Sequence, residues 1–247
     1  MGVIRRLPTF VLVHGGFHGS WCWDLLVAAL EARSFRALAP DLPVTDPSAG
    51  HEEYAAVLAG TISAVDDDVV LVGHSQGGLT IPLVAGDRRV RRLVFLHAGV
   101  PQPGRSLVEF LAEHPEFAPH ASGIAVDDAG RLVIDADLAR RIFFHDCRSD
   151  VTEWALPQLR PQALKPWLDP SPLEAWPATP CTYVIAAQDR ALSPAACRRL
   201  ASSLPGFDLA EIDAGHSSYL SRPDVVADEL LRSAATRKSR APTWKPA

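Results

Sequence analysis

The tripeptide Gly-His-Ser occurs twice in this 247-residue chain, at residues 73–75 and 215–217, and each copy places a histidine beside a serine. The first copy fits the pattern Gly-X-Ser-X-Gly, between the apolar run 69–72 and a helix-like segment. A serine on a tight strand-to-helix turn needs glycine two residues before and after it, because larger side chains would collide there. The spacing predicts that Ser75 is a nucleophile. The competing interpretation is a glycine-rich turn with an incidental serine.

The second copy lacks the second glycine, because Tyr219 occupies that position. Its histidine, His216, lies in a short predicted loop between the last strand and the last helix. A serine hydroxyl is hardly ionised at neutral pH and requires a general base. We therefore expect the two tripeptides to contribute different atoms, the Ser75 oxygen as nucleophile and the His216 ring as base.

The base in turn needs an acid that orients it, and in this architecture the acid lies between the serine and the histidine along the chain. Asp189 opens the loop after the apolar run 181–187, and Asp213 stands three residues before His216. An acid on an adjacent loop can reach across to the imidazole, whereas an acid so near in sequence is expected to cap its own turn. The sequence favours Asp189, with Asp213 as the alternative acid and helix capping as the alternative role of Asp189.

An oxyanion hole requires two converging backbone donors. We expect these to be the N–H groups of Gln76, which follows the nucleophile, and of Gly16, in the glycine-rich loop 14–19 after the first strand. His14 and His18 in that loop raise the question of a metal. The glycines between them predict a loop rather than the helix in which residues four apart would face the same ion. No metal and no cofactor is predicted.

The composition describes a globular protein with 47% hydrophobic and 21% charged residues and a net charge of −5. A mildly acidic chain without a basic run is a poor ligand for nucleic acid or an anionic membrane. No run approaches the roughly 20 apolar residues of a membrane span. The four scattered cysteines form no CxxC pair and predict reduced thiols. We expect a cytoplasmic protein whose partner is a small molecule, and a homodimer is left open.

Six apolar runs alternate with helix-like segments, which predicts an α/β fold with a mostly parallel six-stranded sheet flanked by helices. Pro82, inside one predicted helix, is expected to kink it. The predicted strands span residues 10–13, 36–39, 69–73, 93–98, 181–187 and 208–212, and the predicted helices span 21–33, 54–65, 76–85, 194–204 and 224–234.

The alternation breaks between residues 101 and 176, which is too long for an ordinary loop. This stretch contains a predicted hairpin (123–126 with 132–134) and a predicted helix (136–144). We interpret 101–176 as a cap inserted into a core made of residues 1–100 and 177–236. Residues 237–247 are predicted to be a disordered tail.

Several segments resemble the α/β-hydrolase superfamily, and within it the branch of plant methyl esterases and hydroxynitrile lyases with its bacterial esterase relatives. The resemblance implies a triad of Ser75, Asp189 and His216, with Gly16 and Gln76 as oxyanion donors. The cap matches more loosely, mainly through IFFHDC (142–147). The segments that carry the resemblance are FVLVHGGFHGSWCW (10–23), ALAPDLP (37–43), LVGHSQGG (71–78), QDRALSP (188–194) and DAGHSSYLSRP (213–223).

Aromatic residues of the cap could line an apolar pocket above Ser75 or form the core of the cap itself. The predicted substrate-binding residues are Gly15, Phe17, Phe117, Phe143 and Trp154. Together with the predicted nucleophile, an apolar pocket favours a serine esterase that cleaves a small hydrophobic carboxylic ester through an acyl-enzyme.

Four alternatives stay open on the same scaffold: a thioesterase, a lactonase or cyclase, a C–C lyase of the hydroxynitrile-lyase type, and a receptor that keeps its triad. The lyases of this branch carry threonine after the first-loop histidine and lysine after the catalytic histidine. Gly15 and Ser217 occupy those positions here, which favours ester hydrolysis over C–C cleavage.

Overall fold

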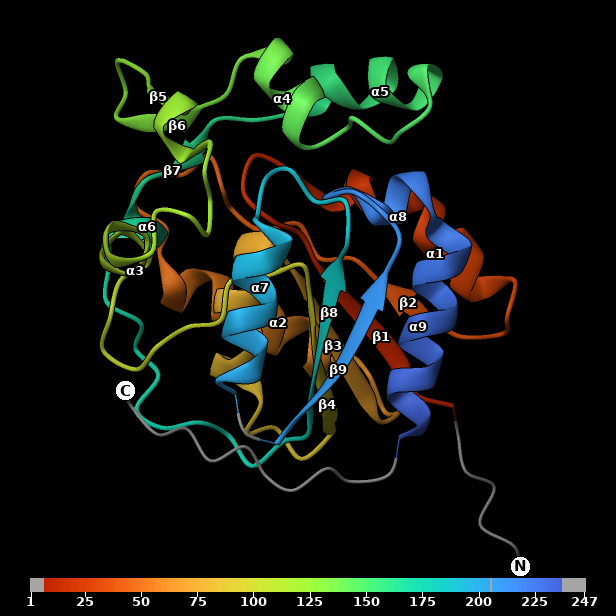
Figure 1. Ribbon diagram of the computed structural model, residues 1–247. Coiled ribbons are helices and arrows are strands. Elements are labelled where there is room, and N and C mark those ends of the chain that lie inside the picture. Colours follow the sequence, from red (N-terminus) through yellow and green to blue (C-terminus); the bar gives the residue numbers. More distant parts are fainter. Residues whose placement is uncertain (1–6, 205, 237–247) are drawn as a thin grey trace, which may run out of the picture.

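A six-stranded parallel sheet forms the centre of the protein, in the order β2-β1-β3-β4-β8-β9 (Figure 1). The structure is a computed structural model that describes residues 7–204 and 206–236. Each neighbouring pair of strands in this sheet is parallel, so the predicted sheet is confirmed. The strands are β1 (Thr9–Val13), β2 (Ala37–Leu38), β3 (Val69–His74), β4 (Val90–Leu96), β8 (Cys181–Ala186) and β9 (Phe207–Ile212).

Alternate residues of the inner strands enter two separate hydrophobic cores, which explains why these strands are apolar on both faces. In β1, Phe10 and Leu12 lie in one core. Val11 and Val13 lie in the other. Helices cover both faces of the sheet: α1 (Asp24–Glu31) and α9 (Pro223–Ala235) on the first, α2 (His51–Ser63) and α7 (Pro194–Ser202) on the second (Figure 1).

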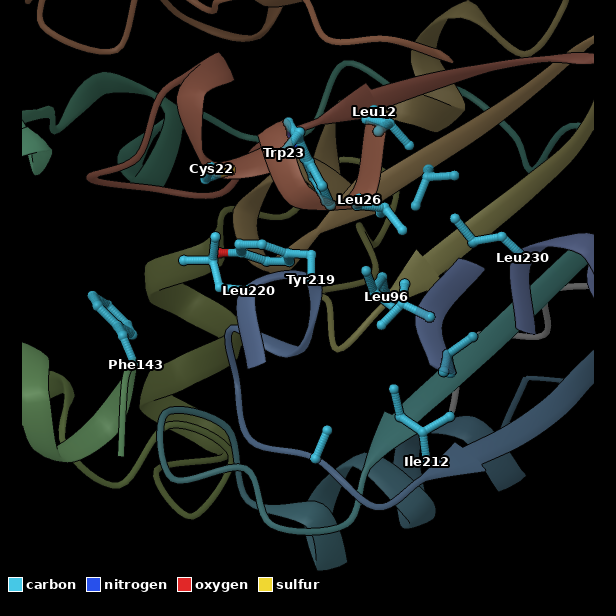
Figure 2. Packing of buried hydrophobic residues seen from close by; sticks show 14 of the residues in the cluster. Leu12, Cys22, Trp23, Leu26, Leu96, Phe143, Ile212, Tyr219, Leu220 and Leu230 are labelled. Carbon is cyan, nitrogen blue, oxygen red and sulfur yellow. The ribbon is translucent and has the colours of Figure 1, made fainter. Parts of the chain in front are cut away.

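The first core holds the last turns of the chain against its beginning. Figure 2 shows Leu12 of β1, Leu26 of α1 and Leu230 of α9 on the same face of the sheet. Each of these side chains is fully buried, and burial of one leucine contributes about 1.5–3 kcal/mol.

Among the described helices, none has the length and apolar character needed to cross a bilayer.

The strand order reverses between β1 and β3, and this reversal positions the candidate site. From β1 the chain passes outward to β2 and then returns to the other side of β1 as β3. The last residue of β1, Val13, pairs with Gly73 of β3. The loops that follow these two strands therefore leave the sheet side by side, which is where open α/β sheets bind ligands.

The predicted helix 76–85 is wrong. The chain forms two 3-10 segments there, Ser75–Leu79 and Ile81–Val84, separated at Thr80. Pro82 lies in the first turn of the second segment. Proline lacks the N–H that an α-helix needs in its interior, and its ring collides with the carbonyl four residues back. The expected kink is a complete break.

Residues 101–176 form a second, three-stranded antiparallel sheet with four short helices. The predicted hairpin and the predicted helix α4 are confirmed, whereas the other helices and β7 were not predicted. In Figure 1 β5, β6, α4 and α5 lie beyond the arrowheads of β8 and β9, whereas α3 and α6 lie to one side of the sheet. The elements are α3 (Leu107–Glu113), β5 (Ala125–Val126), β6 (Arg131–Val133), α4 (Ala136–Ile142), α5 (Ser149–Ala155), β7 (Gln162–Ala163) and α6 (Lys165–Leu168), with 3-10 turns at Ala121–Gly123 and Leu156–Gln158.

Smaller differences concern the ends of elements. The predicted helix 21–33 begins with a 3-10 turn, Ser20–Trp23, before α1. A short helix, α8 (Ser218–Ser221), precedes α9. The predicted tail 237–247 lies outside the described residues.

Two glycines offer a matched test of this packing. A Cβ atom on Gly78 would lie 2.3 Å from the Gly99 carbonyl oxygen, whereas a Cβ on Gly60, in α2, would meet nothing within 4 Å. Gly78→Ala is expected to lower the free energy of unfolding by about 1–3 kcal/mol, because backbone must move. Gly60→Ala is expected to raise it by about 0.5–1 kcal/mol through helix propensity. Urea denaturation measures both, and equal effects of the two substitutions would contradict the described packing.

Candidate active site

Ser75 lies at a strained turn between β3 and the first 3-10 segment. Its φ angle is +51°, in the left-handed region that side chains rarely adopt. A Cβ on Gly73 would lie 2.7 Å from the Gly77 carbonyl oxygen, and a Cβ on Gly77 would lie 2.5 Å from the Val13 carbonyl oxygen. Neither position can hold a larger residue without movement of backbone. The Ser75 carbonyl is fixed by the Gly99 N–H at 3.0 Å.

The glycine-rich loop after β1 packs directly against this turn. A Cβ on Gly15 would lie 2.8 Å from the Ser75 Cβ. A Cβ on Gly16 would lie 2.7 Å from the Gln76 side-chain oxygen. The Gln76 oxygen accepts a hydrogen bond from the Trp167 indole at 2.9 Å. Both predicted oxyanion donors thus belong to backbone segments that contact one another beside Ser75.

The two histidines of this loop hold backbone groups. In His14, Nε2 accepts from the Leu42 N–H at 3.0 Å, which leaves Nδ1 to donate to the Gly15 carbonyl at 2.9 Å. His18 Nδ1 lies 2.8 Å from the Gly16 carbonyl. Within residues 7–204 and 206–236, no group of three or more His, Cys, Asp or Glu side chains is placed to hold a metal ion.

His216 is buried and forms a hydrogen bond with Asp189. The distance from Nδ1 to the carboxylate Oδ2 is 2.8 Å. The other carboxylate oxygen accepts the N–H groups of Ala191 and Leu192 at 2.8 and 2.9 Å, so the acid is held in one orientation. The loops after the paired strands β8 and β9 bring the two residues together.

The structure does not place Asp213 against His216, and it does not use Asp189 to cap a helix. Asp213 is exposed and accepts a hydrogen bond from the Gln188 amide. The residue that caps α7 is Ser193, whose hydroxyl accepts from the Ala196 N–H. The structure therefore pairs the His216 ring with Asp189 and leaves Asp213 on the surface.

Further histidines pack behind His216 and remain neutral. The His74 ring lies 4.5 Å from the His216 ring, and its Nε2 is 3.0 Å from the His216 carbonyl. His97 bonds the Val184 carbonyl and the Ser218 hydroxyl. Burial lowers the pKa of His18 to about 3 and the pKa of His97 to about 4, and it lowers the pKa of His74 well below its usual value. The imidazoles of His18, His74 and His97 are therefore uncharged near neutral pH.

The five predicted substrate-binding residues do not lie together. Gly15 contacts the Ser75 turn, and the Phe143 ring stacks on His216 with centroids 5.5 Å apart. Phe17, which has a φ angle of +65°, packs against Phe143 with ring centroids 6.2 Å apart. Phe117 lies in the other hydrophobic core, against Phe110 at 5.1 Å. Trp154 is 42% exposed and packs edge-on against Trp21.

Two residues of the 101–176 segment that sequence reasoning did not place at the site reach it. The Trp167 indole N–H donates to the Gln76 side-chain oxygen. Gln162 is fully buried beside Gly16, where its Nε2 donates to the Tyr54 hydroxyl and the Ala163 carbonyl. These contacts join residues 91 and 108 positions apart in sequence, and no local pattern signals them.

A small cavity that reaches Gly99 has neither Ser75 nor His216 in its lining. It is lined in part by His51, Leu79 and Arg105 and has a volume of about 20 Å³. That space suits a water molecule rather than a substrate. It is not part of the candidate active site.

Comparison with known proteins decides the family. The alpha/beta hydrolase family model matches residues 10–229. The chain belongs to this family. A carbendazim-hydrolysing esterase from Nocardioides sp. is 31% identical over 91% of this chain and 98% of its own, and a pyrethroid hydrolase from Sphingobium wenxiniae is 28% identical over 89% and 85%. The crystal structure of a pyrethroid hydrolase from Sphingobium faniae has a TM-score of 0.80 at 26% identity, covering 93% of this chain and 98% of that one. The hydrolase is an enzyme of the carboxylesterase type.

Replacement of the two aspartates tests which of them orients His216. Asp189→Asn is expected to lower kcat for an ester about 10⁴-fold with the fold intact, because an amide no longer holds the imidazole in the required tautomer. Asp213→Asn, on the surface, is expected to change kcat less than a few-fold. Steady-state kinetics with circular dichroism as the folding control measures both. The reverse order of effects would move the acid to the end of β9.

The buried histidines predict acid sensitivity of the fold. The unfolded chain binds protons at His18 and His97 below about pH 6.5, whereas the folded protein does not bind them there until about pH 3–4. The effect of each of these two histidines on the free energy of unfolding is small above pH 6.5. Below that pH each lowers the free energy of unfolding, by about 2 kcal/mol at pH 5. In urea denaturation at pH 7.5 and 5.0, His18→Gln should reduce the difference between the two free energies of unfolding by about this amount.

The matched control is the exposed His120, for which His120→Gln should leave that difference unchanged. An undiminished pH dependence in His18→Gln would show that His18 titrates normally in the folded protein.

Proposed function

We propose that this hydrolase cleaves small hydrophobic carboxylic esters through an acyl-enzyme on Ser75, with His216 as general base and Asp189 as its orienting acid. The observation that carries the proposal is the 2.8 Å bond between His216 and Asp189. The His216 carbonyl in turn lies 3.0 Å from Nε2 of His74, the residue that precedes the strained Ser75. A triad is recognised by such geometry and roles rather than by sequence position.

The proposed first step is the attack of the Ser75 oxygen on the ester carbonyl carbon. Because His216 donates its Nδ1 proton to Asp189, its Nε2 carries the free lone pair and can accept the serine proton. The negative charge that develops on the carbonyl oxygen is stabilised by the backbone N–H groups of Gly16 and Gln76. The imidazolium of His216 is stabilised by Asp189.

The second half of the reaction mirrors the first. His216 returns its proton to the departing alkoxide, and the alcohol leaves the acyl group on Ser75. Water then attacks the acyl carbonyl as His216 takes one of its protons. His216 gives this proton to the Ser75 oxygen as the bond between that oxygen and the acyl carbon breaks, which releases the carboxylic acid and restores the Ser75 hydroxyl. The neutral histidines behind His216 leave it as the group that exchanges protons in this proposal.

The proposal assigns a hydrophobic substrate from the rings beside the base. Phe143 stacks on His216, and Phe17 contacts Phe143. Buried aromatic faces favour apolar acyl or alcohol groups. We further propose that the 101–176 segment, which supplies Phe143, acts as a cap over the site. The relatives named as a pyrethroid hydrolase and a carbendazim-hydrolysing esterase support ester-like small molecules as the substrate class.

The C–C lyase alternative is less favourable on the residues beside Ser75. A lyase that releases cyanide needs a positive charge near the leaving group. Ser217, which follows His216, is uncharged and fully buried. Gly15, which packs against Ser75, has no hydroxyl to hold a cyanohydrin oxygen.

The test combines labelling with turnover of two substrate classes. A fluorophosphonate probe should add one adduct, on the peptide that contains Ser75, and short-chain p-nitrophenyl esters should be hydrolysed. Ser75→Ala should abolish labelling and lower kcat about a million-fold. The matched control, Ser217→Ala in the second tripeptide, should retain both. Mandelonitrile should not be cleaved above background.

Labelling on Ser217, or labelling that survives Ser75→Ala, would exclude Ser75 as nucleophile. Cleavage of mandelonitrile that depends on Ser75, without hydrolysis of any ester, would replace the esterase by a lyase.

A further inference from the structure

The carboxylate of Asp146 links the 101–176 segment to the loop that carries His216. Asp146 follows α4 within the sequence IFFHDC and precedes α5. Its Oδ2 accepts the Gly215 N–H at 2.7 Å and the Ser221 hydroxyl at 2.7 Å. One oxygen atom therefore contacts both ends of the segment 215–221, which consists of the His216 loop and α8.

Gly215 allows this approach because it has no side chain. A Cβ atom there would lie 2.4 Å from Asp146 Oδ1 and 2.6 Å from the His145 ring. The glycine of the second Gly-His-Ser tripeptide is thus required by a contact from a distant segment. The glycine of the first tripeptide, Gly73, is required by its own turn.

The position of the His216 backbone decides whether its ring meets Asp189. Gly215 is bonded to His216 directly, and the His216 carbonyl is held from the other side by His74 at 3.0 Å. A backbone hydrogen bond to a charged acceptor is stronger than one between neutral groups. The Asp146 carboxylate bonds the backbone and not the imidazole, so it does not replace Asp189 as the acid.

We infer that Asp146 is a positioning residue that sets the His216 loop so that Nδ1 meets Asp189 and Nε2 faces Ser75. This inference rests on the proposed function for its kinetic consequences. Its structural consequence, the integrity of the His216–Asp189 hydrogen bond, does not depend on any turnover.

Three variants separate positioning from general stabilisation. Asp146→Ala removes the acceptor and should lower kcat for p-nitrophenyl esters by about 10–100-fold, since a misplacement of about 1 Å can cost 100-fold. KM should change less than about three-fold, because the apolar contacts to the substrate stay. Asp146→Asn can present its carbonyl oxygen to the same two donors and should restore kcat to within a few-fold of the wild type. Asp150→Ala, at an exposed carboxylate of the same segment, should leave kcat unchanged.

Proton NMR supplies the readout that needs no substrate. The downfield Nδ1 proton of His216, hydrogen-bonded to Asp189, should be observed in the wild type and in Asp146→Asn and should broaden or disappear in Asp146→Ala. Urea denaturation confirms that each variant is folded under the assay conditions. Should Asp146→Ala not fold, Ser221→Ala removes one of the two donors and should lower kcat two- to five-fold with a weakened resonance.

An unchanged kcat and an unchanged His216 resonance in a folded Asp146→Ala, or in Ser221→Ala if it takes that place, would overturn the inference. An Asn variant as impaired as the Ala variant would overturn it as well, because the acceptor oxygen would then not be the cause. Failure of the proposed function is distinct: ester turnover would survive Ser75→Ala, while the resonance would still report on Asp146.

Discussion

The left-handed turn at Ser75 is the constraint on which the rest of the site depends. The turn raises the serine above the end of the sheet. It can form only if the neighbouring backbone segments pack so closely that there is no room for a Cβ atom between them. Gly73 and Gly77 satisfy that requirement within the turn, and Gly15 satisfies it from the neighbouring loop. The reversal of strand order between β1 and β3 brings this loop to the turn. The topology of the sheet and the conformation of one serine are therefore parts of the same arrangement.

Much of this arrangement could be predicted from the sequence, because its determinants are local. The spacing of Gly73, Ser75 and Gly77 encodes the turn, and the apolar runs encode strands buried on both faces. Chain order admits both Asp189 and Asp213, and the place of Asp189 on an adjacent loop favours it as the aspartate that the structure pairs with His216. These features depend on a few neighbouring residues or on chain order alone.

The parts that could not be predicted depend on contacts between distant segments. Phe117 and Phe143 are both apolar residues of the same segment, yet they enter different cores. Gly215 looks like a copy of Gly73, although its small size is required by Asp146. The break at Pro82 is an intermediate case: proline predicted a local disturbance, but only the fold shows that two 3-10 segments replace the helix. Periodicity describes the face that a residue presents and not the partner that it finds.

The 101–176 segment contacts the surroundings of the candidate site through three separate hydrogen bonds: Trp167 bonds Gln76, the Arg160 N–H bonds the Phe17 carbonyl at 2.8 Å, and Asp146 bonds Gly215. This segment contains strands of only two or three residues and short helices, whereas the main sheet is buried in two cores. Units with fewer buried contacts open at lower free energy than the core of a protein. On warming, we therefore expect the enzyme to lose its activity reversibly while its sheet is still folded, so that opening of the 101–176 segment, rather than melting of the whole chain, would set the temperature optimum.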